Sequence, residues 1–466
     1  VDNLPRTLRL VLLSREDPGV SLSRLRARGR LTEIRAGDLC FADQEAVDFL
    51  NGTMALGLET AAALRLNGRT EGWIAGVQMA VLSLAGREDV EGFLDDFAGT
   101  HRFIVDFLVD EVLDRQPQEI REFLLATSIL ERLTAPLCDA VTGTSRSRAL
   151  LEELERRNML LVPLDDRREW YRYHQLFADV LRAHALRHKG SEVPAGHARA
   201  SRWYEENGDR RAAIAHAFSS GDIDVTADLV ERSWPELSYG IRPMTWLAWA
   251  EKLPESAVAA RPVLSAACAW MLLDKGDLFR AERHLRAVES FLRAEEGRQN
   301  PSGAAEPIVA NASEFQTLPG SLEAAWAYFD LLRDDAAGAI GHAEKAGQLL
   351  SGEDHFWQGT ASLFAGLAQW FSGDLEAAYQ RISESVRHQR AAGNHFYEAF
   401  GMATRADIRM AQGRLRDAHK EYERIIAAGG PSVEVDRGAQ LIQDPVALHA
   451  GLGELYRRWG DLDRLA

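Results

Sequence analysis

Two side chains, Arg15 and His174, are of residue types that can hold a phosphate group. Arg15 follows the apolar run 8–14, which is typical of a buried parallel strand. The C-terminal ends of such strands are where α/β sheets bind ligands, and a guanidinium matches two phosphate oxygens. A ring N–H of His174 can donate to a phosphate oxygen. From position alone, a solvated turn arginine is the favoured alternative for Arg15, and a capping or buried histidine is the alternative for His174.

No catalytic or metal-binding motif accompanies these two residues. The 466 residues contain no G-x-S-x-G, H-E-x-x-H or G-x-G-x-x-G pattern, and the 13 histidines are scattered. The three cysteines lie far apart without a C-x-x-C pair, which argues against a zinc site and is typical of a reduced, cytoplasmic protein. We therefore expect that the chain alone is not an enzyme.

The overall charge is acidic. There are 54 Lys and Arg residues against 70 Asp and Glu residues, which gives a net charge of −16. A nucleic-acid-binding surface needs a basic excess, so the composition argues against direct DNA contact over most of the chain. The longest apolar stretches fall short of the roughly 18 residues that a membrane span needs, so we expect no membrane partner.

Different elements must position Arg15 and His174. Around Arg15, short strands are expected over 8–14 and 31–35, as in the last part of an α/β domain. A helical stretch follows, with glycines after the helices and a proline at one helix start. Its helices are expected over 54–67, 71–84, 100–116 and 117–125. Around His174, the expected order is that of a winged helix: helix 147–158, strand 159–164, turn, strand 169–173 and helix.

The third helix of this winged helix carries a mixed charge pattern. Glu152, Glu153 and Glu155 lie there among three arginines. Carboxylates oppose contact with DNA phosphates, so the pattern favours a structural and switching role over DNA reading.

The second half of the chain contains a recurring motif of Gly, a polar residue and then Ala. Its glycines are Gly208, Gly276, Gly373 and Gly413, and Gly460 begins it again. Intervals of 40 residues from Gly373 to Gly413 and 47 from there to Gly460 are typical of paired-helix repeats. Glycine ends one helix, Asp caps the next, and Ala lets the two approach closely. One more unit is expected over 334–346, and a long loop over 295–319.

Aromatic residues are frequent in these repeats. Trp270, Trp326, Trp370 and Tyr379 are expected to fill the spaces between units. Three further tryptophans could line a pocket, although core packing is the favoured alternative; they are Trp234, Trp246 and Trp249.

Four stretches, in this order along the chain, resemble one family. They are Leu10-Val-Leu-Leu-Ser-Arg-Glu-Asp-Pro18, Leu22-Ser-Arg-Leu-Arg-Ala-Arg-Gly29, Thr70-Glu-Gly-Trp-Ile-Ala-Gly76 and Trp170-Tyr-Arg-Tyr-His-Gln-Leu-Phe177. Over 1–220, and more loosely over the repeats, the chain is similar to the large ATP-binding LuxR-type transcriptional regulators, the MalT-like class of STAND NTPases. It resembles the middle of such a regulator, because the 466 residues contain no G-x-x-x-x-G-K-[ST] P-loop, no Walker B strand and no basic helix-turn-helix after the repeats.

The resemblance implies a mainly α fold in four parts. Residues 1–42 would be the C-terminal remnant of an α/β nucleotide-binding domain, and residues 43–130 a helical subdomain. Residues 131–190 would form the winged helix. Residues 191–466 would form an α-α, tetratricopeptide-like superhelical repeat array that acts as the sensor.

The resemblance also implies roles for three residues. Arg15 matches the sensor-1 arginine, which reaches the terminal phosphate. Trp73 lies where related NTPases line the nucleotide base, with a core tryptophan as an equally favoured alternative. His174 matches the winged-helix histidine that contacts the ADP phosphate and holds the off state. ATP or ADP with Mg²⁺ is the cofactor of the full-length family, and no cofactor is expected for this chain alone.

Two functions stay open at this stage. In the first, the chain is the signal-sensing and switching segment of an ATP-dependent LuxR-type regulator. A small-molecule inducer or a regulatory protein would bind the repeats, ATP would replace ADP and allow a homo-oligomer, and DNA would be bound only through a C-terminal domain. In the alternative, the chain is a stand-alone tetratricopeptide-like interaction scaffold that binds no nucleotide.

Overall fold

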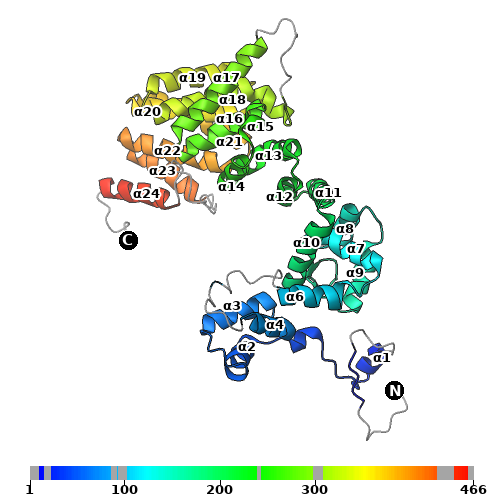
Figure 1. The fold of residues 1–466 in the computed structure, drawn as a ribbon. Coiled ribbons are helices and arrows are strands. Elements are labelled where there is room, and N and C mark those ends of the chain that lie inside the picture. The colour runs from blue at the N-terminus through cyan, green and yellow to red at the C-terminus, as the bar shows by residue number, and fades with distance from the viewer. Residues whose placement is uncertain are drawn as a thin grey trace. The chain divides into compact units, whose positions relative to one another are not determined.

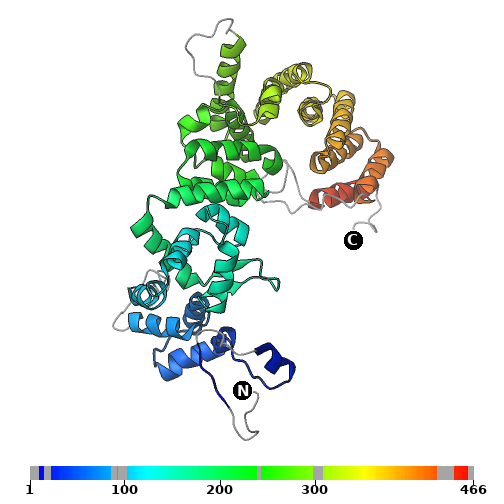
Figure 2. The same cartoon turned by 90° about the vertical axis from the view of Figure 1, so that its right-hand side faces the viewer.

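The computed structural model describes residues 10–14, 22–84, 92, 102–238, 243–296, 308–427 and 445–459. The chain divides into two compact units, Val1–Gly221 and Asp222–Ala466, and each is treated by itself. Regular structure in the described residues is almost entirely helical (Figures 1 and 2), as the sequence predicts.

The first unit begins with short helical elements. They are α1 (Leu22–Ala27), η1 (Ala36–Leu39), α2 (Asp43–Asp48), η2 (Phe49–Thr53), α3 (Thr60–Thr70), α4 (Ile74–Leu84), α6 (Arg102–Phe107) and η3 (Leu108–Leu113). The prediction of strands over 8–14 and 31–35 is wrong for the residues of these segments that the structure describes. Leu10 to Leu13 are irregular and at least half exposed, and residues 31–35 are irregular as well. A strand needs a neighbour for its backbone hydrogen bonds, and no strand in the described part of the chain pairs with either segment.

The expected helix boundaries around Gly68 shift in the structure. α3 begins at Thr60 rather than at residue 54, because Asn51 holds the preceding loop through two hydrogen bonds with the Leu58 backbone (2.7 and 2.9 Å). The helix also passes Gly68 and ends at Thr70, since the left-handed residue that stops it is Glu71. α4 starts at Ile74 and ends at Leu84, as expected for its C-terminus.

The expected winged helix is confirmed. Its elements are α7 (Gln118–Thr127), α8 (Ala135–Thr142), α9 (Ser147–Arg156), β1 (Leu161–Pro163), β2 (Tyr171–Tyr173) and α10 (Gln175–Lys189). The strands pair antiparallel with Leu161 opposite Tyr173, and Asn158 has the expected left-handed conformation (φ 50°). Helices α11 (Val193–Glu206) and α12 (Arg210–Ser220) complete the unit.

The described part of the second unit consists of helices, most of them in antiparallel neighbouring pairs. They are α13 (Ile223–Ser238), α14 (Pro243–Ala250), α15 (Glu255–Ala259), α16 (Pro262–Lys275), α17 (Leu278–Glu296), α18 (Ala312–Leu332), α19 (Ala336–Leu349), α20 (His355–Phe371), α21 (Leu375–Ala391), α22 (His395–Ala411), α23 (Leu415–Ala427) and α24 (Pro445–Trp459). From α18 onward, each helix packs against the next along the chain (Figure 2).

The turns between these helices have the expected chemistry. Gly276, Gly373 and Gly413 all have positive φ, between 75° and 88°. Asp374 then caps α21 by accepting a hydrogen bond from the Ala377 N–H (3.1 Å). Gly460 lies outside the described residues.

The additional repeat unit expected over 334–346 is confirmed as α19. Asp334 replaces the glycine with a φ of 61°, and Asp335 caps the helix at the Gly338 N–H (2.9 Å). The prediction of a long loop over 295–319 is wrong from residue 312 onward, where α18 begins. Asn311 caps α18, and the helix continues through Pro319.

Candidate functional site

The turn between α3 and α4 forms the first half of the candidate site. After Thr70, Glu71 and Gly72 take left-handed conformations with φ of 50° and 74°. A side chain at Gly72 would collide with the backbone of Phe41, whose N–H donates to the Gly72 carbonyl (2.9 Å). Only glycine permits this close approach together with a positive φ. The turn therefore fixes the position of Trp73, whose ring is partly buried.

The junction between β2 and α10 forms the second half. His174 is the residue just before α10, and its backbone N–H donates to the Leu160 carbonyl (2.7 Å). The preceding Tyr173 is buried, and its hydroxyl hydrogen-bonds with Thr127 of α7 (2.7 Å). These two contacts tie the junction to the body of the winged helix, so its side chains have defined directions.

An ion pair joins the two halves. The guanidinium of Arg172 donates to both carboxylate oxygens of Glu71, each at 2.8 Å. The backbone N–H of Gln175 donates to the same carboxylate (2.9 Å). A bidentate contact of this kind is directional and stronger than a single hydrogen bond between neutral groups. The pair connects residues 101 positions apart and closes the helical subdomain onto the winged helix.

The rings of Trp73 and His174 meet beside this ion pair. Their centroids are 5.8 Å apart in an edge-on arrangement. His174 is 7% exposed, and its Nε2 lies 3.0 Å from the carbonyl oxygen of Thr70. A carbonyl only accepts, so Nε2 carries the proton in this arrangement. The structure thus brings together two of the three residues that the sequence selects, and Arg15 lies outside the described residues.

The protonation of these groups follows from burial and charge. Burial raises the pKa of Glu71, but the hydrogen bonds from Arg172 and Gln175 outweigh it, so the pKa lies below its usual range. Burial lowers the pKa of His174, and the neighbouring Glu71 carboxylate offsets this only in part. His174 is therefore neutral at pH 7, and its buried Nδ1 has no hydrogen-bond partner among the described residues.

This arrangement fits a nucleotide phosphate under one condition. A phosphate oxygen is an acceptor, whereas Nδ1 of the neutral His174 ring is also an acceptor. The ring can donate to phosphate only if it takes a second proton or if Nε2 leaves the Thr70 carbonyl. The negative charge of a phosphate nearby would favour the protonated ring. Trp73 and His174 therefore fit one side of a nucleotide site, provided that the contact with Thr70 responds to the ligand.

Sequence reasoning did not find the pair of Glu71 and Arg172. A signal was present in the sequence. Glu71 lies two residues before Trp73, and the oppositely charged Arg172 lies two residues before His174. Their pairing depends on the left-handed turn at Glu71. The sequence pattern predicts the end of this helix at Gly68, which is three residues too early.

Two carboxylates of α9, the acidic helix, have partners within the winged helix. Glu153 pairs with Arg157 (2.5 Å), the residue that follows the end of α9. Glu155 pairs with Arg168 (3.2 Å) and accepts a hydrogen bond from the hydroxyl of Tyr171 (3.2 Å). These pairs occupy cations that a DNA-reading helix would direct to phosphates.

The tryptophans considered for a pocket take different places. Trp246 is fully buried, packs on Trp234 with centroids 5.0 Å apart, and donates to the Val230 carbonyl (2.9 Å). It belongs to the core of the second unit. Trp234 lines a pocket together with Trp270 and Trp357, and Trp249 is not among the lining residues.

The described residues hold neither a metal-binding cluster nor a membrane-spanning helix. No group of three or more His, Cys, Asp or Glu side chains there could hold a metal ion. None of the helices described is both long enough and apolar enough to cross a membrane.

Comparison with known proteins gives the class to which this architecture belongs. The MalT winged helix domain matches residues 109–193, and the MalT-like TPR (tetratricopeptide repeat) region matches residues 320–465. A winged helix followed by TPR-type helices is the arrangement observed in the structure. The chain is therefore similar to MalT in these two regions, and the resemblance seen in the sequence is confirmed.

Individual relatives support this assignment. The HTH-type transcriptional regulator MalT of Yersinia enterocolitica is 27% identical over 435 residues, covering 90% of this chain and 45% of the relative. The serine/threonine-protein kinase PknK of Mycobacterium tuberculosis is 37% identical over 308 residues, covering 63% of this chain and 28% of the relative. The chain thus spans less than half the length of either protein.

One solved structure is similar at lower identity. It is a STAND protein with a tetratricopeptide repeat sensor from Pyrococcus horikoshii, 14% identical with a TM-score of 0.48. The match covers 83% of this chain and 59% of that chain.

Proposed function

We propose that this chain is the switching and sensing segment of a nucleotide-dependent, MalT-like transcriptional regulator. The observation that carries the proposal is the closed junction between the two halves of the candidate site. Glu71 and Arg172 hold the junction together, and Trp73 and His174 lie in contact beside them.

In this proposal the junction is the bistable element of the switch. In the closed state, the Nε2–H of His174 is bonded to the Thr70 carbonyl, and the Glu71–Arg172 pair is intact. ATP or ADP with Mg²⁺ would be held mainly by a P-loop, a motif absent from these 466 residues. A bound nucleotide supplies phosphate charge, which would favour a doubly protonated His174 and stacking on Trp73. Arg15 would add a guanidinium for the terminal phosphate.

The TPR-type helices would receive the signal in this proposal. A small-molecule inducer or a regulatory protein that binds the open state better than the closed state shifts the population toward the open state. Opening would allow a homo-oligomer to form, and a separate domain would read DNA. The cytoplasm is the proposed location.

The test uses the natural protein that carries this segment. Release of a fluorescent ADP analogue is measured for wild type and for His174→Gln. We expect release to become about tenfold faster, because a lost charge-assisted contact is worth about 1.5 kcal/mol. His188→Gln is the matched control, since His188 is an exposed histidine near the end of α10, the helix that His174 precedes. Equal release rates for His174→Gln and wild type would contradict the proposed role of His174.

A scaffold that binds no nucleotide is the second candidate. The closed junction favours it, because the described contacts of His174 are complete at Nε2 without a nucleotide. If the natural protein retains no ADP analogue at all, the scaffold function replaces the switch function.

A further inference from the structure

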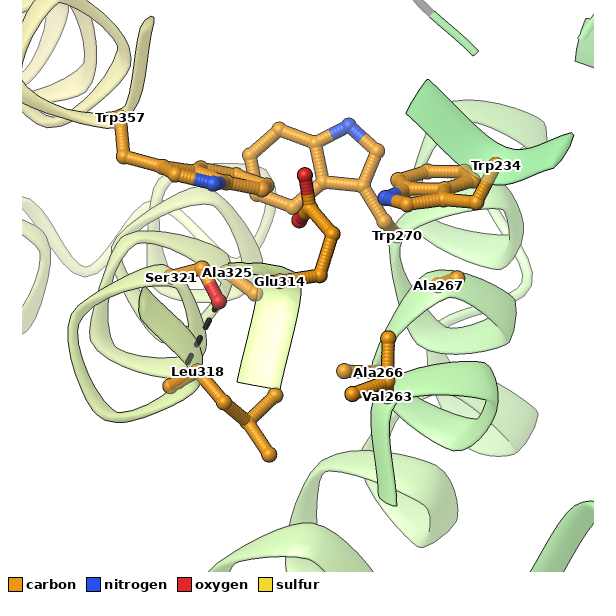
Figure 3. Close-up of a pocket in the computed structure, with 10 residues that line it drawn as sticks. All are labelled: Trp234, Val263, Ala266, Ala267, Trp270, Glu314, Leu318, Ser321, Ala325 and Trp357. Atoms are coloured by element: carbon orange, nitrogen blue, oxygen red, sulfur yellow. Dashed lines mark hydrogen bonds between the residues drawn. The ribbon is translucent and has the colours of Figure 1, made fainter. Parts of the chain in front are cut away.

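A pocket within the second unit combines three indole rings with one carboxylate. It lies among α13, α16, α18 and α20, and its empty space, including the part open to solvent, is about 320 Å³. Its lining residues are Trp234, Val263, Ala266, Ala267, Trp270, Glu314, Leu318, Ser321, Ala325 and Trp357. Figure 3 shows the Glu314 side chain projecting from α18 toward the rings of Trp234, Trp270 and Trp357.

The rings lie on more than one side of the carboxylate (Figure 3). Trp270 and Trp357 meet edge to face, with centroids 5.2 Å apart and an interplanar angle of 85°. Trp234 stands on the opposite side of Glu314 from Trp357 (Figure 3). Each tryptophan is at most 6% exposed, whereas Glu314 is only partly buried.

The lining offers almost no other polar group. Besides Glu314 and the tryptophans, six residues line the pocket, and five of them are aliphatic; the sixth is Ser321. The hydroxyl of Ser321 already donates to the Leu318 carbonyl (3.2 Å). A ligand in this pocket therefore meets apolar and aromatic surface with a single acidic group.

We propose that this pocket binds a small organic ammonium ion, with the indole rings around its alkyl groups and Glu314 as the counter-ion. The electron-rich faces of indole rings attract a cation, and Trp is the most effective aromatic side chain for this purpose. The proposal names a ligand class for the sensor region and therefore rests on the proposed sensing function.

The electrostatics of the empty pocket agree with this ligand class. Burial raises the pKa of Glu314 to about 7, a hydrogen bond from the Trp357 indole lowers it, and the nearby Asp354 raises it. A buried carboxylate without a cation is costly to ionise. A bound ammonium ion would supply the missing positive charge, so binding and ionisation of Glu314 support each other.

A sugar is the competing ligand class, because sugars also stack on tryptophan. Each buried sugar hydroxyl needs a hydrogen-bond partner, and an unpaired one costs about 1–3 kcal/mol. The lining provides Glu314 and Ser321 as its only polar side chains outside the indoles. An alkylammonium ion needs only one counter-charge, so the observed lining favours the cation.

The test compares choline with 3,3-dimethylbutan-1-ol, its uncharged isostere, in calorimetric titrations of the 466-residue chain. We expect choline to bind saturably and the alcohol to bind at least tenfold more weakly, since both have the same shape and only choline carries a charge. Glu314→Gln should weaken choline binding at least tenfold. Glu344→Gln is the matched control, because Glu344 is an exposed glutamate on α19 outside the pocket.

Three results would overturn the inference. They are equal binding of choline and the alcohol, choline binding that Glu314→Gln leaves unchanged, and binding of maltose without binding of choline. The comparison of the two isosteres uses the wild-type chain, so it stands even if Glu314→Gln fails to fold. The nucleotide-release experiment is independent of this one, so failure of choline binding leaves the proposed switch intact and removes only the ligand class.

Discussion

The ion pair between Glu71 and Arg172 should be one of the strongest polar contacts holding the junction. We consider Glu71→Gln, Arg172→Met and the double variant, which form a double-mutant cycle. The guanidinium makes two hydrogen bonds of 2.8 Å, and the side chains of Arg172 and Glu71 are only 35% and 22% exposed. Hydrogen bonds to charged groups contribute about 1.5–3 kcal/mol, whereas exposed pairs contribute about 0–1 kcal/mol. Allowing for solvent screening, we expect a coupling energy of about 1.5 kcal/mol.

Local hydrogen exchange measures this coupling. The free energy of opening is obtained for backbone amides around residues 70–76 and 172–180, so no assumption about global unfolding is needed. The pair of Glu111 and Arg115 is the control, because it is exposed and joins residues only four positions apart at the C-terminal end of η3. Its coupling should stay near 0.3–0.5 kcal/mol. A coupling energy for Glu71 and Arg172 no larger than that of the control pair would refute the claim that this ion pair holds the junction closed.

The same pair has a defined pH dependence. The pKa of Glu71 is lower in the folded state than its ordinary value of 4.5. Its contribution to stability is therefore fully present above pH 4.5 and is lost as the pH falls through the lowered folded-state pKa. Opening of the junction should become easier below pH 4.5 in wild type, and this trend should be absent in Glu71→Gln.

Two further predictions concern packing and protonation elsewhere. A side chain at Gly320 would overlap Leu350, so Gly320→Ala should lower the free energy of unfolding by about 1–3 kcal/mol. The control is Gly341→Ala, whose Cβ meets nothing within 4 Å, and it should raise the free energy of unfolding by up to about 1 kcal/mol. Thermal unfolding of both variants checks this. Burial and the adjacent His197 lower the pKa of His216 from 6.5 to about 4. The contribution of His216 to stability should therefore be fully present above pH 6.5 and should fall by at most about 3 kcal/mol toward pH 4. Urea midpoints of wild type and His216→Gln across this range would show whether this pH dependence of stability disappears in the variant.

The sequence predicts elements well where the determining chemistry is local. The turn at Gly373 and Asp374 is an example, because a left-handed glycine and an Asp cap act within four residues. The hairpin of the winged helix is another, since Asn158 and the turn at 165–168 flank two short apolar strands. Such patterns carry their physical cause in the residues themselves.

The errors arise where distant contacts decide. Gly68 looks like a helix stop, but α3 continues to Thr70 because the backbone of Phe41 meets Gly72 and fixes the turn there. Pro319 looks like a loop residue, yet Asn311 caps a helix that passes through it. A proline costs only one backbone hydrogen bond and some steric strain, and packing along α18 outweighs that cost. Neither outcome has a signal within a few residues.

In the proposed switch, the residues of the junction would have different tasks. Glu71 and Arg172 contribute stability but hardly respond to ligands near neutral pH, because both stay charged. His174 contributes one hydrogen bond, and its protonation can change when a negative charge arrives, since burial keeps the ring neutral beforehand. Suppose that a ligand gains free energy in the open state only through its contact with His174. That gain must then exceed the free energy that the ion pair contributes to the closed state before the junction opens. This argument predicts that weakening the ion pair makes the junction more responsive to ligand, whereas removing His174 makes it unresponsive.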